Sequence, residues 1–245
     1  MLAASLIEDD PVLTAKLLKT ANSAFFGLHR SVSNARDAIN VLGLIKVRAL
    51  VIAASLGEGF HTVGGVNLNQ FWRYSLHTAK LARSLAGSVH QNQVAAYTVG
   101  LLHGLGELLI HLSDPERVQS LNTLVPPLDL RRCKVEMRIF GYCYSRVTAA
   151  LARRWQLPEM VVDALSYQHA PFENHAYEPL AGVIHLAVWR VRVHELGLDE
   201  RERVVSFPDE VALALGLDID MVLRQDPIDW TPRHEAEPEA ADYLV

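Results

Sequence analysis

The fold is decided by residues 10–27, which read DPVLTAKLLKTANSAFFG. Asp10 is a good helix cap because its carboxylate accepts hydrogen bonds from the free N–H groups of the first turn. Pro11 fits the first helical position, where no N–H is needed, and three leucines recur on one face of the following turns. Gly27 can end the helix. The stretch therefore predicts an amphipathic helix that ends near Gly27, with Phe25 and Phe26 at its hydrophobic end.

Helical patterns continue after this stretch. The further helices are expected over 33–43, 45–56, 68–86, 93–112, 129–141, 145–155, 158–167 and 178–196. Residues 57–66 contain four glycines and predict a linker. Gly104 and Gly106, inside an expected helix, indicate either close helix packing or the floor of a pocket, and packing is favoured. No alternating strands flanked by Asn-Gly or Asp-Gly turns occur, so we expect an all-α fold.

The carboxyl-terminal part differs from the rest in composition. Residues 208–224 show a loose helical pattern broken by Gly216, which predicts one or two short helices on the main body. From residue 226 the chain is rich in proline and acidic residues, so loop or disorder is expected. Trp230 and Tyr243 are bulky aromatics in this polar tail, and they are expected to dock in a surface groove or to bind a partner.

Charge and composition narrow the class of protein. With 245 residues, 50% of them hydrophobic, the chain can bury one large core or two small lobes. The formal charge of −5 and the pI near 6.1 argue against a basic surface for nucleic acid. Arginine pairs are expected on solvated helix faces. These pairs are Arg131 with Arg132, Arg153 with Arg154, and Arg190 with Arg192.

Cysteine usage and the amino-terminal sequence bear on location. Cys133 and Cys143 lack the paired spacing of a zinc ribbon or a disulfide scaffold, so we expect buried free thiols. The first ten residues lack a basic region and turn acidic too early for a secretory signal. The apolar run 49–56 is far shorter than the roughly 18 residues of a membrane helix. A cytoplasmic protein without membrane contact is predicted.

Residues 10–27, followed by AINVLGL at 38–44, resemble the hallmark of the HDOD domain. This family is a degenerate relative of the HD-type metal phosphohydrolases, found in bacterial signalling and regulatory proteins and often without catalytic residues. The resemblance implies a bundle of two helical lobes: an HDOD domain over 1–196, with a first lobe at about 1–60 and an HD-like lobe at about 67–196. A C-terminal extension follows over 197–245. The family normally has further helical sequence before residue 1, so a truncated amino terminus is expected.

The same resemblance locates the positions that bind metal in HD enzymes. The adjacent His-Asp pair becomes His103-Gly104 here, within GLLHGLGELL at 100–109. The first histidine matches Tyr74, the final aspartate matches Val188, and the lysine that often follows the pair matches Glu107. Tyrosine, glycine and valine at these places do not supply the ligands that an ion needs to make hydroxide from water. We therefore expect no enzyme, no metal and no cofactor.

Two further observations concern this vestigial centre. Residues 140–158 resemble a family segment that usually has histidine where Tyr144 stands. On a continuous helix His103, Glu107 and His111 would form one stripe, but its ends lie about 12 Å apart, too far for one ion. We favour His103 as a core histidine with a backbone partner, with Glu107 and His111 facing solvent or a lobe interface. The candidates for the vestigial pocket are Tyr74, His77, His103, Glu107 and His169.

These patterns lead to one functional expectation and two alternatives. The expected function is a non-enzymatic bacterial signalling or regulatory module that binds another protein or a nucleotide-like ligand. The first alternative is a metal-dependent phosphohydrolase with an altered ligand set, acting on a nucleotide or a cyclic dinucleotide. The second is a sensor in which the vestigial pocket binds a nucleotide without turnover. Bound metal and a nucleotide-induced gain in stability would discriminate among the three.

Overall fold

The computed structural model describes residues 7–22, 31–43, 47, 63–173, 177–225, 227, 228 and 230. Within these residues every regular element is helical and no strand occurs, so the predicted all-α fold is confirmed. Several expectations lie outside the described residues. They are the helix end at Phe25 and Phe26, nearly all of the helix at 45–56, the linker over 57–62, and the tail after residue 230 with Tyr243.

The described residues contain the following helices, in chain order. They are α2 (Pro11–Ala21), α4 (Leu68–Ser88), α5 (Gln93–Leu102), α6 (Leu105–Ser113), α7 (Pro115–Leu124), α8 (Arg132–Phe140), α9 (Tyr144–Arg154), α10 (Glu159–Tyr167), α11 (Pro179–Glu195), α12 (Glu200–Ser206), α13 (Asp209–Ala214) and α14 (Ile219–Arg224). Residues 35–43 are also helical and end at Gly43, whose φ of +74° suits glycine.

The first helix begins as predicted and ends earlier than predicted. Oδ1 of Asp10 accepts hydrogen bonds from the N–H groups of Val12 at 2.8 Å and Leu13 at 3.0 Å. The helix ends at Ala21, well before Gly27, which lies outside the described residues. The capping signal is local and was therefore readable from the sequence, whereas the end of the helix was not.

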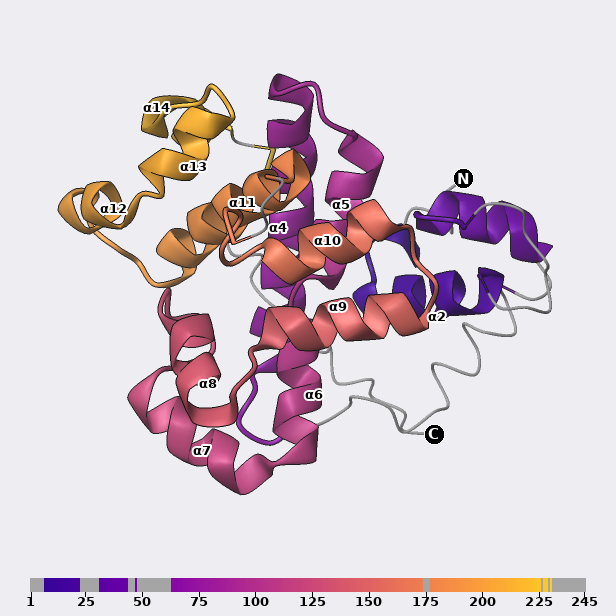
Figure 1. Cartoon of the computed structure of the whole chain (residues 1–245), viewed down its shortest axis with the longest axis horizontal. Helices are drawn as coiled ribbons and strands as arrows, with labels where there is room; N and C mark the ends of the chain where they lie inside the picture. Colours follow the sequence, from indigo (N-terminus) through magenta and orange to yellow (C-terminus); the bar gives the residue numbers. More distant parts are fainter. Residues whose placement is uncertain are drawn as a thin grey trace, which may run out of the picture.

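The helices pack around α4, α5 and α11 (Figure 1). Helix α4 lies along α5, and α11 packs against α4. Helices α9 and α10 lie side by side across this layer. Helix α6 packs against α9 and α7, and α8 contacts α9, while the short helices α12, α13 and α14 gather beside α11. The centre that the sequence places near His103 is thereby enclosed by α4, α6, α9 and α11.

The single helix expected over 93–112 is two helices, α5 and α6, which meet at His103 and Gly104. The carbonyl oxygen of His103 accepts hydrogen bonds from Oγ1 of Thr148 at 3.2 Å and from Nε2 of Gln168 at 3.1 Å. Because these side chains take the carbonyl, no helical N–H is needed there. Close packing explains the second glycine, since a Cβ on Gly106 would collide with the carbonyl oxygen of Tyr144.

The C-terminal extension packs on the main body. Val211, Ala212 and Val222 are buried in the same hydrophobic cluster as α4 and α11. Trp230 docks on the main body, as the sequence predicted. Its ring centroid lies 3.9 Å from the ring centroid of His194 and 4.8 Å from the guanidinium carbon of Arg190.

Two helices, α7 and α12, were not anticipated. Helix α12 nevertheless begins with a capping box, in which the side chains of Asp199 and Glu202 each accept the other's backbone N–H. Helix α7 begins with Pro115 after Asp114, whose Oδ1 accepts the N–H of Arg117 at 3.2 Å. Both starts follow the same local rule as Asp10, so the signals were present in the sequence.

Among the residues that the structure describes, one helical stretch, Gln93–Ser113, is long and apolar enough to cross a membrane by length and composition. It comprises α5 and α6, and 83% of its most apolar window is buried inside the fold. Burial of this extent is what the core helix of a folded domain shows.

Candidate functional site

The centre predicted near His103 holds a buried arginine. Arg192 on α11 lies one helical turn after Val188, and 5% of its surface is exposed. Its Nε donates a hydrogen bond to the hydroxyl oxygen of Tyr74 at 2.9 Å, and its Nη2 donates to the hydroxyl oxygen of Tyr144 at 3.2 Å. Its Nη1 donates to the carbonyl oxygen of Asp129 at 3.2 Å. The expectation that Arg192 keeps a solvated helix face charged was therefore wrong.

The surroundings of Arg192 favour its charged form. Burial alone would lower the pKa of its guanidinium, but Tyr144, Tyr74 and Glu107 outweigh burial and raise that pKa. Burial raises the pKa of both Tyr74 and Tyr144, so their hydroxyls stay neutral. The guanidinium carbon also lies 5.8 Å from the ring centroid of Tyr74 and 5.5 Å from that of Tyr144. Two neutral tyrosines thus enclose one permanent cation.

His103 lies beside this cation without binding it. Its ring meets the ring of Tyr74 edge-on, with centroids 4.7 Å apart. Its Nδ1 is 2.6 Å from the carbonyl oxygen of Gly100, so the prediction of a core histidine with a backbone partner is confirmed. Burial, together with the nearby charge of Arg192, lowers the pKa of His103 to about 3. Its Nε2 has no hydrogen-bond partner among the described residues.

A second buried arginine neutralises the carboxylates next to this centre. Arg132 is 0% exposed, and its Nη2 lies 2.6 Å from Oε1 of Glu107. Its Nε donates to Oε1 of Glu136 at 2.7 Å, and Oε2 of Glu136 accepts the backbone N–H of Tyr144 at 2.7 Å. Burial and the neighbouring carboxyl group of Glu136 raise the pKa of Glu107. The chain Glu107, Arg132, Glu136 therefore ties α6 and α8 to the start of α9.

Glu107 and His111 do not face solvent, which was one of the two positions expected for them. They are 4% and 2% exposed. Arg132 makes the burial of Glu107 tolerable, because a buried carboxylate needs a charge partner. His111 binds the backbone instead: its Nδ1 is 2.8 Å from the carbonyl oxygen of Glu107. The stripe from His103 to His111 requires one continuous helix. Because the helix is broken at Gly104, this stripe does not form.

Three of the five predicted pocket residues surround Arg192, and the other two contact different side chains. Tyr74, His103 and Glu107 lie around Arg192. His77 instead contacts Trp230, with ring centroids 5.2 Å apart, and burial lowers its pKa to about 4. His169 lies just after the end of α10, where its Nδ1 is 3.0 Å from a serine hydroxyl.

Residues 2–171 match the family model of the HDOD domain. The chain belongs to the HDOD domain family. An uncharacterized protein of Treponema pallidum (strain Nichols) is 27% identical over 191 residues, which cover 77% of this chain and 37% of that protein. The chain thus spans little more than a third of the length of this relative.

Solved structures share the fold. The MmoQ response regulator of Methylococcus capsulatus str. Bath superposes with a TM-score of 0.71 at 24% identity, covering 90% of this chain and 87% of that chain. A candidate phosphohydrolase of Shewanella amazonensis SB2B gives 0.57 at 29% identity, covering 87% and 77%. A candidate signal transduction protein of Marinobacter aquaeolei VT8 gives 0.53 at 25% identity, covering 91% and 50%.

Sequence reasoning missed the arginines that organise the centre of this HDOD domain. The signal for Arg132 was its spacing to Glu136, because residues four apart on a helix face each other. The signal for Arg192 was its place in a helix that is apolar on nearly all sides, one turn after a position matched to a metal ligand. Neither signal distinguishes a buried arginine from a solvated one until the partners are known.

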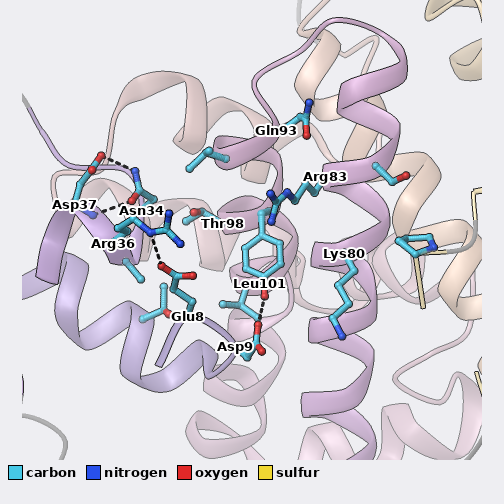
Figure 2. A pocket seen from close by; sticks show the side chains of 16 residues that line it. Glu8, Asp9, Asn34, Arg36, Asp37, Lys80, Arg83, Gln93, Thr98 and Leu101 are labelled. Atoms are coloured by element: carbon cyan, nitrogen blue, oxygen red, sulfur yellow. Dashed lines mark hydrogen bonds and ion pairs between the residues drawn. The ribbon is translucent and has the colours of Figure 1, made fainter. Parts of the chain in front are cut away.

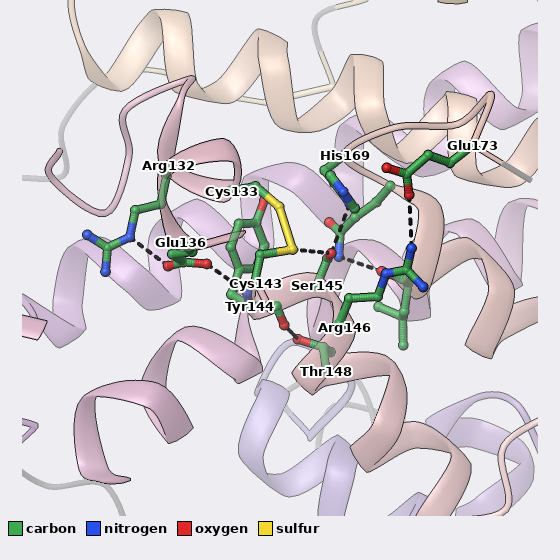
Figure 3. Close-up of a disulfide and its surroundings, with 12 residues drawn as sticks. Arg132, Cys133, Glu136, Cys143, Tyr144, Ser145, Arg146, Thr148, His169 and Glu173 are labelled. Atoms are coloured by element: carbon green, nitrogen blue, oxygen red, sulfur yellow. Dashed lines mark hydrogen bonds and ion pairs between the residues drawn. A yellow bond between two sulfur atoms is a disulfide. The ribbon is translucent and has the colours of Figure 1, made fainter. Parts of the chain in front are cut away.

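The expectation of free thiols was also wrong, although both cysteines are buried as predicted. Cys133 on α8 and Cys143, the residue before α9, form a disulfide (Figure 3). Gly141 ends α8 with a φ of +80° and turns the chain back, so the two Cα atoms come within 5.2 Å. This turn, rather than a paired sequence spacing, brings the sulfurs together.

The HDOD domain also has a cavity of about 760 Å³ between its amino-terminal residues and the helices α4 and α5 (Figure 2). Lys80 and Arg83 line it from α4, and two other lining residues, Glu8 and Arg36, form an ion pair with 3.2 Å between Oε1 and Nε. The hydroxyl of Tyr97 donates a hydrogen bond to Asp9. No sequence pattern pointed to this cavity, because its walls come from five separate stretches of the sequence, from Glu8 to Pro227.

Proposed function

We propose that this HDOD domain is a non-catalytic bacterial signalling or regulatory module that acts by binding. The observation that carries the proposal is the guanidinium of Arg192 between Tyr74 and Tyr144. Both tyrosines stand at positions matched to histidines in the wider family. A built-in cation there repels a metal ion, and neutral tyrosines do not replace the lost ligands.

The remaining carboxylate does not restore a metal site. Glu107 is the carboxylate that α6 brings to this centre, and it is already paired with Arg132. Hydroxide formation needs an ion held by several ligands with an open position left over. The centre instead has hydrogen bonds arranged around a fixed charge, which suits a structural core.

A signalling role has support from the family and from one solved structure of similar fold. The HDOD family model matches most of the chain, and the protein of Marinobacter aquaeolei VT8 is described as a signal transduction protein. On this proposal, the surface or the cavity carries the function, and the partner is a protein or a nucleotide-like ligand.

The alternative is a metal-dependent phosphohydrolase acting on a nucleotide or a cyclic dinucleotide. It has two observations in its favour: Nε2 of His103 has no partner among the described residues, and one similar structure is a candidate phosphohydrolase. The charge of Arg192 beside His103 argues against it, because an ion bound at Nε2 would be repelled.

Metal content and hydrolysis test the proposal directly. The Cys143→Ser variant is used, because it cannot bind an ion through both cysteine sulfurs if the disulfide becomes reduced. We expect that the purified variant does not contain one equivalent of metal. We also expect no hydrolysis of a nucleotide or a cyclic dinucleotide when divalent cations are added. One equivalent of metal together with hydrolysis that a chelator abolishes would refute the proposal and establish the phosphohydrolase.

A nucleotide-like partner is tested at the cavity lined by Lys80 and Arg83. A ligand at 100 times its Kd stabilises the protein by roughly 2.7 kcal/mol, which a thermal shift detects. If nucleotides bind there, the Arg83→Gln variant loses the shift and the exposed Arg201→Gln variant keeps it. No shift with any nucleotide leaves a protein as the partner.

A further inference from the structure

Three side chains that are good ligands for a soft metal ion lie close together near Tyr144, which contacts Arg192. They are Cys133, Cys143 and His169, whose possible ligand atoms all lie within 4.8 Å of one another. They come from three elements: helix α8, the residue before α9, and the segment after α10 (Figure 3). None of the ligand positions discussed for the HD-type centre includes a cysteine, so this is a different constellation.

Two of the three side chains are buried, and His169 is partly exposed. Cys133 and Cys143 are buried in a small apolar cluster with Ile110 and Val118. Burial lowers the pKa of His169, so its imidazole is neutral at pH 7 and keeps a lone pair for a metal ion. Thiolate and neutral imidazole are the ligands that Zn²⁺ takes in tetrahedral sites.

Ser145 links the cysteines to the histidine. Its Oγ is 3.1 Å from Sγ of Cys143 and 3.0 Å from Nδ1 of His169. A hydroxyl in this place orients the imidazole ring, as partners of ligating histidines commonly do. The cluster therefore has three candidate ligands and a hydroxyl that contacts two of them.

We propose that the reduced form of this protein binds a soft divalent cation, of which Zn²⁺ is the type, through Cys133, Cys143 and His169. A dithiol reductant supplies two electrons and two protons to the disulfide and becomes a disulfide itself. Each thiol then loses one proton as its sulfur binds the ion. A water molecule completes four-coordination. The disulfide and the metal site exclude each other, because the same two sulfurs make both.

Cobalt titration tests the proposal, because Co²⁺ bound by thiolates gives strong charge-transfer absorption and Zn²⁺ displaces it. The full chain is reduced under anaerobic conditions, and free thiols are counted by alkylation and mass spectrometry. We expect two free thiols, about one equivalent of Co²⁺ with thiolate charge-transfer bands, and competition by Zn²⁺. The oxidised protein should show neither free thiols nor these bands.

Variants separate the three ligands from other histidines. Cys133→Ser, Cys143→Ser and His169→Gln should each abolish the cobalt spectrum or change its form. Ser145→Ala should weaken binding by about 10- to 100-fold, as loss of an orienting partner does. The control is His90→Asn, at an exposed position after α4 with a φ of 56° that asparagine tolerates.

The proposal fails if the reduced protein gives no thiolate bands, or if the bands persist unchanged in Cys133→Ser. It also fails if the two thiols cannot be generated by the reductant. These results leave the proposed binding function untouched, since that rests on Arg192 and is measured in a variant that lacks one of the two thiols.

Discussion

Arg192 on α11 donates a hydrogen bond from Nε to the hydroxyl oxygen of Tyr74 on α4, across 2.9 Å in the buried centre of the domain. This contact joins two helices that in an HD-type enzyme would each supply a metal ligand. On the proposed function, a cation and a neutral hydroxyl make the helix-to-helix connection that the ion makes in such an enzyme. The centre of this domain is occupied by the buried side chain of Arg192.

Removing the hydroxyl of Tyr74 should destabilise the fold. In Tyr74→Phe the Nε–H of Arg192 loses its acceptor while it remains buried, which costs about 1–3 kcal/mol. Urea unfolding followed by circular dichroism measures this. Tyr142→Phe is the control, because Tyr142 is an exposed tyrosine of the same domain. Equal unfolding midpoints for Tyr74→Phe and the wild type would show that the hydrogen bond contributes nothing.

Adjacent arginines provide a matched test of the buried ion pairs. Arg132→Met leaves the carboxyl groups of Glu107 and Glu136 buried without their cation, and breaking a buried pair costs about 3–5 kcal/mol. Arg131→Met removes an exposed arginine that pairs with Asp129, so little change is expected. Both are measured by urea unfolding. A similar loss for the two variants would contradict the role assigned to Arg132.

The stability of the domain should fall in acid. Burial lowers the pKa of His103 to about 3 and that of His185 to about 4, from 6.5. The unfolded chain therefore binds more protons than the folded one below pH 6.5, and stability present above that pH is lost as the pH falls. Each histidine contributes about 2 kcal/mol of loss between pH 6.5 and 5.

Glu107 acts in the opposite direction. Burial raises its pKa from 4.5, so its contribution favours folding at low pH and is lost as the pH rises above 4.5. Urea unfolding at pH 7 and pH 5 gives the net effect, which we expect to be a loss in acid. His185→Gln should reduce the difference in the free energy of unfolding between pH 7 and pH 5 by the contribution of one histidine, about 2 kcal/mol. An unchanged difference in this variant would exclude His185 as a source of the pH dependence.

Local chemistry explains which parts of the fold were predicted well. The cap at Asp10 and the turn at Gly43 depend on neighbouring residues only, and both are found. The break at His103 depends on Thr148 and Gln168, which are 45 and 65 positions away in the sequence. No periodicity within α5 and α6 reports these partners, so the two helices were predicted as one.

The candidate site also divides into residues that the sequence located and residues whose burial depends on distant partners. Resemblance located Tyr74 and His103, because those positions follow a family pattern. The burial of Arg132 depends on Glu107 from another helix, and the pairing of Cys133 depends on the turn that follows α8. A charged or sulfur-containing side chain has no fixed burial of its own, and its partner decides whether it is inside.

Restoring the lost ligands should not by itself restore a metal centre. The variant with Tyr74→His, Gly104→Asp and Val188→Asp regains the ligand types of an HD-type site, but the charge of Arg192 remains beside them. We expect it to bind no metal, and we expect about one equivalent after Arg192→Leu is added, because the repulsion is then gone. Elemental analysis in the Cys143→Ser background measures both, with circular dichroism to verify that the helices form. Metal bound in the presence of Arg192 would show that the guanidinium does not keep the ion out.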